Sequence, residues 1–107
     1  MREGMKPVSR VAVVTGGGSG LGEAIAIHLG RDGHRVAVFD IDGSGAERVA
    51  AQIRANGGDA LGVTVDVAEP VSITAGFETT RSALGPVAIL VTSAALGGFT
   101  RFDRITL

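Results

Sequence analysis

The octapeptide Thr-Gly-Gly-Gly-Ser-Gly-Leu-Gly at residues 15–22 decides the fold, because it joins a short apolar run to a helical pattern. The run before it, residues 11–15, is rich in valine, as buried strands are. After the octapeptide starts its helix, four apolar residues and one histidine recur at three- and four-residue steps: Leu21, Ala24, Ile25, His28 and Leu29. The stretch therefore predicts a strand, a tight glycine turn and a helix whose apolar face includes these five positions.

The rest of the chain repeats this alternation. Residues 35–39, 61–65 and 87–92 are short apolar runs, which predict strands buried on both faces of a parallel sheet. Helical spacing separates them, with inward positions expected at Ala46, Val49, Ala50, Ile53, Ile73, Phe77 and Leu84. Pro70 is expected in the first turn of the third helix, and glycines follow the end of each helix.

The element order β-α-β-α-β-α-β predicts an α/β fold with a parallel sheet and right-handed crossovers. The expected strand order is 3-2-1-4, which is the first half of a Rossmann-type doubly wound sheet plus one strand. Such a sheet is incomplete. At 107 residues the chain is expected to form one domain, with a flexible N-terminus at residues 1–8 and a loop at 96–107 that leads toward a missing helix.

Composition excludes several classes of function. The net charge is −1 with scattered basic residues, so we expect neither a nucleic-acid partner nor an anionic membrane surface. The chain has no cysteine, which excludes disulfides, a thiolate nucleophile and cysteine-type zinc sites. Its apolar runs are far shorter than the roughly 18 residues of a membrane span. No secretory signal pattern is recognisable, so a cytoplasmic location is expected.

The glycine loop has the position of a diphosphate site, because free N–H groups and the positive end of a helix dipole face an anion there. Gly16 is expected to turn the chain off the strand, and Gly20 to let phosphate oxygens approach the backbone. Gly22 is expected to allow close packing between helix and strand. No Gly-Lys-Ser/Thr sequence follows, so the loop is not a P-loop. The alternative interpretation is a flexible turn without a ligand.

Asp40 ends the second apolar run, 18 residues after Gly22. A carboxylate there can accept hydrogen bonds from both adenosine ribose hydroxyls and repel the 2′-phosphate of NADP. The repulsion is about 4 kcal/mol per unit charge at roughly 4 Å and an effective dielectric constant near 20. The sequence neighbours Ile41 and Asp42 bring no positive charge, which favours NAD. A solvated strand-end aspartate is the alternative.

Two further segments follow strand ends. Asp66 and Val67 follow the third strand, where the carboxylate and the Val67 amide suit the edge of an adenine ring; an aspartate near a helix N-terminus is the alternative. Ser93, Ala94 and Ala95 follow the fourth strand and are small enough to lie along a nicotinamide ribose, or are simply loop residues. The residues expected to contact NAD are Gly16, Ser19, Gly20, Leu21, Gly22, Asp40, Ile41, Asp66, Val67, Ser93, Ala94 and Ala95.

These segments resemble the short-chain dehydrogenase/reductase family over residues 8–107. The octapeptide is similar to its Thr-Gly-x-x-x-Gly-x-Gly signature, Asp40 to its NAD-selecting acid, and Asp66-Val67 to its adenine-contacting pair. One departure is local: the family usually has Asn-Asn-Ala-Gly where residues 92–95 read Thr-Ser-Ala-Ala. The resemblance implies hydride transfer between NAD(H) and an alcohol or carbonyl substrate, by an enzyme that forms oligomers.

The resemblance also implies a catalytic Tyr-x-x-x-Lys pair, which the sequence lacks: it has no tyrosine, and Lys6 precedes the first strand. His28 and His34 are not convincing substitutes. We therefore expect the cofactor-binding part of a longer oxidoreductase, with no catalytic residue in this chain. Two alternatives stay open, a non-catalytic nucleotide-binding module and a Rossmann epimerase or nucleoside-sugar enzyme with the same first half.

Overall fold

Four parallel strands form one sheet in the order β3-β2-β1-β4, as the sequence predicts. The computed structural model describes residues 8–93, so the expectations for 96–107, and for 1–8 apart from Val8, lie outside the described residues. The elements are β1 (Val11–Thr15), α1 (Gly20–Arg31), β2 (Arg35–Asp40), α2 (Gly43–Ala55), β3 (Asp59–Thr64), α3 (Pro70–Leu84) and β4 (Val87–Thr92). The fold is an α/β, Rossmann-like one.

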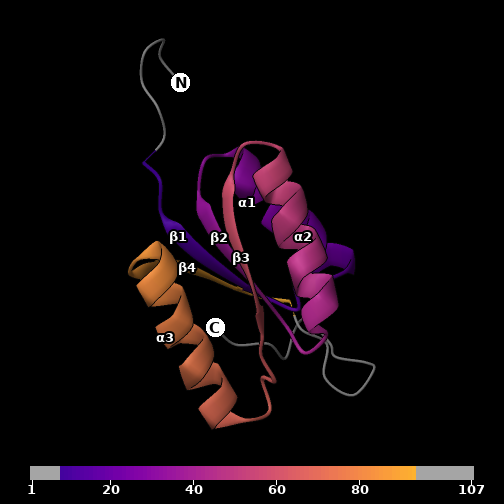
Figure 1. Ribbon diagram of the computed structural model, residues 1–107, viewed down its shortest axis with the longest axis vertical. Helices are drawn as coiled ribbons and strands as arrows, with labels where there is room; N and C mark the ends of the chain where they lie inside the picture. The colour runs from indigo at the N-terminus through magenta and orange to yellow at the C-terminus, as the bar shows by residue number, and fades with distance from the viewer. Residues whose placement is uncertain (1–7, 94–107) are drawn as a thin grey trace, which may run out of the picture.

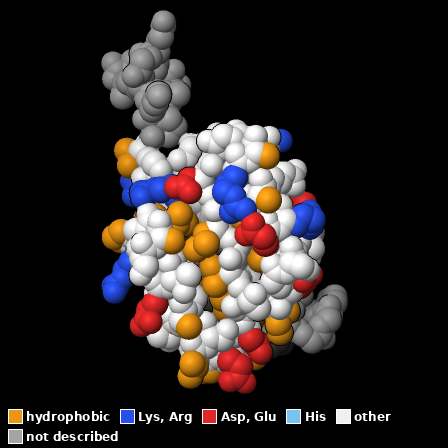
Figure 2. Space-filling model, in the orientation of Figure 1, with side chains coloured by type: hydrophobic (Ala, Val, Ile, Leu, Met, Phe, Trp, Pro, Cys, Tyr) orange, Lys and Arg blue, Asp and Glu red, His pale blue; other side chains and the backbone are white. Residues whose placement is uncertain are grey.

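Helices cover both faces of the sheet: α1 and α2 lie on one side and α3 on the other (Figure 1). Strands β1 and β2 are buried on both faces, as their apolar runs predict. That prediction is wrong for β3 and β4, whose residues are mostly half-buried or exposed because both strands lie at sheet edges. Figure 2 shows hydrophobic side chains gathered between α2 and α3, over β3.

The face that α1 turns to the sheet was predicted only in part: Ile25 and Leu29 pack against the hydrophobic cluster as expected, but other expected positions are exposed. The buried residues of α1 are Gly22, Ala26 and Gly30, whereas Leu21 is 60% exposed. The contact is so close that a Cβ at Gly30 would lie 2.7 Å from Cγ2 of Ile53. Small residues therefore set how closely α1 approaches α2 and the sheet, and Ile25 and Leu29 pack beside them. The expectation for His28 is also wrong, because its side chain is 75% exposed and lies 3.6 Å from Asp32.

The faces that α2 and α3 turn to the sheet are the ones predicted from the sequence. All four inward positions of α2 are buried, and Ile73, Phe77 and Leu84 of α3 pack on the opposite face of the sheet. Pro70 is in the first turn of α3. Strand β3 begins two residues earlier than expected and β2 ends one residue later, because the ladder between them runs from Arg35–Asp59 to Asp40–Thr64.

Gly76 is expected to be required by packing, although glycine weakens most helices. A Cβ there would lie 2.7 Å from Cγ2 of Val65 and 3.1 Å from the Phe39 ring. Gly76→Ala should therefore destabilise the chain by about 1–3 kcal/mol, where an exposed helical site would gain about 1 kcal/mol. Urea unfolding measures this effect. Thr79→Ala, at an exposed position of α3, is the control; a Gly76→Ala chain as stable as the unaltered one contradicts the prediction.

Candidate functional site

The loop between β1 and α1 lies at the edge of the sheet where the parallel strands end. Gly16 has a φ of +66°, which turns the chain sharply off β1 as predicted. The next amide, Gly17 N–H, donates to the carbonyl oxygen of Phe39 at 3.1 Å, so the loop is attached to the end of β2. Two neighbouring strand ends thus support the turn.

The first turn of α1 presents backbone donors at this edge. Ser19 is the N-cap residue, but its side chain makes no capping hydrogen bond to the helix. The amides of Gly20 and Leu21 have no partner inside the helix, as is general for a first turn. Gly20 has a φ of +56°, and the position where its Cβ would stand is open. The loop therefore offers N–H groups and free space at the positive end of a helix dipole, which suits an anion.

Gly22 brings α1 into contact with the turn and with the end of β4. A Cβ at this position would lie 2.1 Å from the Gly16 carbonyl oxygen and 2.5 Å from Oγ of Ser93. Ser93 in turn donates to the Thr15 carbonyl oxygen through both its N–H and its hydroxyl. Gly16, Gly22 and Ser93 are therefore brought together, and Ser93 ties β4 to β1 where the family usually has an asparagine. Ala94 and Ala95 lie outside the described residues.

Asp40 connects the end of β2 to the glycine loop. Its Oδ2 accepts a hydrogen bond from Gly18 N–H at 2.9 Å, and its Oδ1 accepts one from Asp42 N–H at 3.0 Å. The side chain is half-buried, and the following residue, Ile41, is 68% exposed. A carboxylate has about four acceptor positions. Two therefore remain on Asp40 for a ligand that carries two hydroxyl groups.

Asp66 lies at the same edge but has a local structural role. Its Oδ1 accepts from Ala68 N–H at 3.0 Å, and its own N–H donates to Oγ of Ser72 at 2.9 Å. The preceding residue, Val65, donates to the Asp40 carbonyl oxygen, which places Asp66 just beyond the end of the ladder. Val67 is half-buried and packs against the hydrophobic cluster under α3.

The structure adds a positive charge that inspection of sequence neighbours missed. Nη2 of Arg48, on α2, donates to the Gly18 carbonyl oxygen at 2.8 Å and to Glu23 at 2.9 Å. The glycine loop itself contains no basic residue, and Arg48 reaches it from α2. Arg48 follows Asp40 by eight residues, and only the packing of α2 against α1 brings it to the loop. A surface arginine in a helix gives no sequence signal for such a contact.

Asp42 was also missed as a structural residue, although an aspartate before a helix is a recognised signal. Its carboxylate accepts hydrogen bonds from the Ser44 hydroxyl and from the N–H groups of Ser44 and Gly45, and so caps α2. The Ser44 hydroxyl, followed by the Gly45 amide, lowers the pKa of Asp42 below its ordinary value. The cap fixes the segment between Asp40 and α2.

The pH dependence of stability should reflect this cap. Because the pKa of Asp42 is lower in the folded chain, ionised Asp42 stabilises the fold above its unfolded pKa, and this contribution is lost as the pH falls through the folded value. Asp42→Ala should lower the melting temperature at pH 7 by roughly 3–8 °C. The difference from the unaltered chain should shrink in acid. Melting curves from pH 7 to pH 3 test this, and a difference independent of pH contradicts it.

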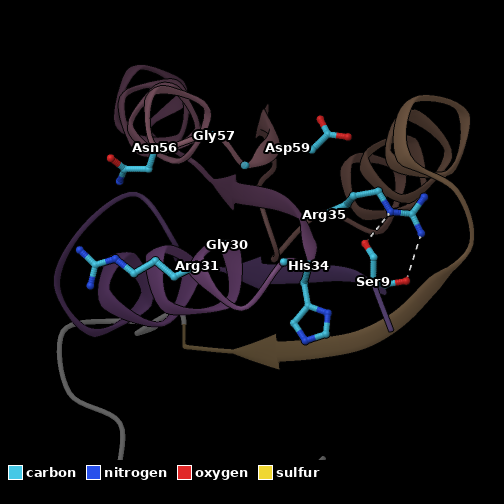
Figure 3. Close-up of a pocket in the computed structure, with 10 residues that line it drawn as sticks. Ser9, Gly30, Arg31, His34, Arg35, Asn56, Gly57 and Asp59 are labelled. Atoms are coloured by element: carbon cyan, nitrogen blue, oxygen red, sulfur yellow. Dashed lines mark hydrogen bonds between the residues drawn. The ribbon is translucent and has the colours of Figure 1, made fainter. Parts of the chain in front are cut away.

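A hollow of about 480 Å³ lies at the opposite end of the sheet, between the ends of α1 and α2. Figure 3 shows the side chains of Arg31, His34 and Asp59 pointing in different directions, and Arg35 bonded to Ser9. Both helices direct their C-terminal ends here, and the negative end of a helix dipole disfavours an anion. This hollow therefore lacks the convergent donors of the glycine loop.

Two other classes of site find no support in residues 8–93. No helix in this part of the chain has both the length and the apolar character needed to span a membrane. No group of three or more histidine, aspartate or glutamate side chains in the same residues is arranged to hold a metal ion.

Comparison with known proteins agrees with this geometry. Residues 10–107 match the family model for short chain dehydrogenases. The chain is 38% identical to 2-(S)-hydroxypropyl-CoM dehydrogenase 3 of Xanthobacter autotrophicus over 85% of its own length and 36% of that protein. It is 36% identical to D-threitol dehydrogenase of Mycolicibacterium smegmatis over 92% of its length and 38% of that protein.

The similar solved structures are dehydrogenases as well. A 7α-hydroxysteroid dehydrogenase in complex with NADH and 7-oxo glycochenodeoxycholic acid has a TM-score of 0.80 and 35% identity, over 90% of this chain and 38% of that one. A hydroxysteroid dehydrogenase from Escherichia coli has the same score and identity over 90% of this chain and 41% of its own. The chain thus spans somewhat more than a third of the length of the relatives it matches.

Proposed function

The chain belongs to the short-chain dehydrogenase family, and from that premise we propose that it forms the NAD-binding part of an oxidoreductase acting on an alcohol or carbonyl substrate. The observation that carries the proposal is the junction of the glycine loop and Asp40. There, N–H groups of a first helical turn and a half-buried carboxylate lie side by side, linked through Gly18. A dinucleotide presents the matching groups, a diphosphate and a ribose diol.

The loop donors are assigned to the diphosphate. The amides of Gly20 and Leu21 start α1 without helical partners, and Gly20 leaves open space beside them. Exposed Leu21, after the glycine loop, and exposed Ile41, after Asp40, supply apolar surface. The adenine ring is assigned to the side of Ile41, Asp66 and Val67, and the nicotinamide ribose to the side of Ser93, Ala94 and Ala95.

The choice of NAD over NADP is assigned to Asp40. Its carboxylate accepts both hydroxyls of an unmodified ribose and repels a 2′-phosphate. Arg48 does not reverse this preference, because its guanidinium group is already bonded to the Gly18 carbonyl oxygen and the Glu23 carboxylate. Its positive charge is therefore matched by a negative one.

Hydride transfer is proposed for the whole protein, not for residues 1–107 alone. Bound nicotinamide supplies the hydride donor or acceptor, and this chain positions it. The sequence contains no tyrosine to act as the family's acid or base. The same observation favours a second candidate, a nucleotide-binding module without turnover. We expect the 107-residue chain to bind NAD without oxidising secondary alcohols, and the two candidates then differ in whether the gene encodes a Tyr-x-x-x-Lys segment after Leu107.

Calorimetric titration of the chain with NAD and with NADP tests the proposed cofactor. NAD should bind at least about 100-fold more tightly than NADP. A 100-fold ratio corresponds to about 2.7 kcal/mol, and the repulsion between Asp40 and a 2′-phosphate is about 4 kcal/mol per unit charge. ADP-ribose should bind nearly as well as NAD, because the assigned contacts are to the adenosine and diphosphate groups. Equal affinities for NAD and NADP, or no binding of either, contradict the proposal.

A further inference from the structure

Arg48 joins three elements at the glycine loop. It extends from α2, where its side chain is 55% exposed, and donates through Nη2 to the Gly18 carbonyl oxygen at 2.8 Å. Both terminal nitrogens also donate to Glu23 of α1, Nη2 to Oε1 at 2.9 Å and Nη1 to Oε2 at 3.3 Å. A single guanidinium group thus makes a forked pair with a carboxylate and a bond to a backbone carbonyl.

Gly18 is consequently held on both sides. Its N–H donates to Oδ2 of Asp40, and its carbonyl oxygen accepts from Arg48. The peptide group between Gly18 and Ser19 leads directly to the amides at the start of α1. Fixing that peptide in the free chain reduces the ordering required when a ligand binds.

The pair with Glu23 has an electrostatic consequence. Glu23 is in the first turn of α1, the end of the helix assigned to the diphosphate. Its carboxylate has the same sign as that ligand and, if unpaired, would repel it. A glutamate at its ordinary pKa is already ionised at neutral pH, and the hydrogen bond from Arg48 lowers the pKa of Glu23 below that value. Arg48 is the counter-charge to this carboxylate.

We propose that Arg48 is a positioning residue for the dinucleotide: it fixes the Gly18 carbonyl oxygen and neutralises Glu23 beside the diphosphate. This inference rests on the proposed function, since the diphosphate is the ligand it concerns. It assigns to α2 a part in diphosphate binding, although Arg48 itself contacts the protein.

Three variants separate the two effects. Arg48→Met keeps the aliphatic stem and removes the donors, Glu23→Gln removes the negative charge, and the double variant removes both. Calorimetry with NAD should give about tenfold weaker binding for Arg48→Met, equal or tighter binding for Glu23→Gln, and a partial recovery, about threefold, for the double variant. Arg48→Lys should lie between Arg48→Met and the unaltered chain, because lysine keeps the charge without the fork.

Binding of adenosine 5′-monophosphate serves as the matched readout. Its single phosphate depends less on the start of α1, so Arg48→Met should weaken it less than NAD. A merely structural role would weaken both equally, and melting curves of each variant show whether the fold is kept. Unchanged NAD affinity in Arg48→Met overturns the proposal, and so does a double variant that binds no better than Arg48→Met.

Hydrogen exchange of the free chain tests the loop contact without a ligand. Arg48→Met should speed exchange of the Gly18 amide, which is bonded to Asp40, about tenfold, with the amides of β1 and β2 unchanged. Should the unaltered chain fail to bind NAD, the proposed function fails, and this exchange measurement still decides whether Arg48 orders the loop. Unaltered exchange at Gly18 contradicts the positioning role.

Discussion

Gly22→Ala is expected to destabilise the chain by about 3 kcal/mol and to abolish measurable NAD binding. The added Cβ would lie 2.1 Å from the Gly16 carbonyl oxygen and 2.8 Å from the Gly16 carbonyl carbon. Neither atom can move without changing the turn that follows β1. The start of α1 must then shift away from β1, and the amides assigned to the diphosphate shift with it. Urea unfolding and calorimetry with NAD measure the two effects.

Gly20→Ala is the matched control for this substitution. Its Cβ would meet no atom within 4 Å, so its cost comes from the φ of +56° alone. That cost is roughly 1–2 kcal/mol, clearly less than the steric cost at Gly22. If the two alanine variants unfold at the same urea concentration, the predicted steric cost of a Cβ between α1 and the turn is contradicted.

Asp40→Asn is expected to weaken NAD binding by about 10- to 100-fold and to reduce the discrimination against NADP. The substitution removes the negative charge and replaces one of the two acceptor oxygens with a donor. The Gly18 amide, which bonds to Oδ2 at 2.9 Å, loses a charged partner as well. With the carboxylate gone, its repulsion of a 2′-phosphate is lost. NADP should therefore lose less affinity than NAD, or gain some.

Asp42→Asn is the control for charge. It removes one negative charge two residues away, from a carboxylate that is engaged in capping α2. Asparagine is also a good N-cap residue, so the helix should keep its start. The ratio of NAD to NADP affinity should change by less than about threefold. An equal effect of both substitutions would show that overall charge, and not Asp40, selects the cofactor.

The sheet was predictable because its signals are local and periodic. Valine-rich runs at β1 and β2, glycines after each helix and Pro70 at the start of α3 each act over a few residues. Strand order followed from the right-handed crossover rule. The buried face of α1 was predicted only in part. Ile25 and Leu29 pack on the core as expected, but the fully buried residues are Gly22, Ala26 and Gly30, and a hydrophobic pattern gives no weight to glycine.

The candidate site was predictable in part for the same reason. Gly16, Gly22 and Asp40 occupy positions fixed by the βα turn and the end of β2, so their spacing in the sequence carries their geometry. The position of Arg48 in the sequence does not reveal its contact with Gly18, because that contact depends on how α2 packs against α1. The role of Ser93 could not be foreseen either, because its bond to Thr15 joins residues 78 positions apart.

The most direct test of the central claim is titration of the isotope-labelled chain with NAD, followed by two-dimensional NMR of its amides. The account predicts shifts in the loop from Gly16 to Gly22 and around Asp40, where the diphosphate and the ribose diol are assigned. The hollow at the other end of the sheet, lined by Ser9, Arg31 and His34, should be unaffected. Shifts confined to that hollow, or no shifts at millimolar NAD, contradict the account.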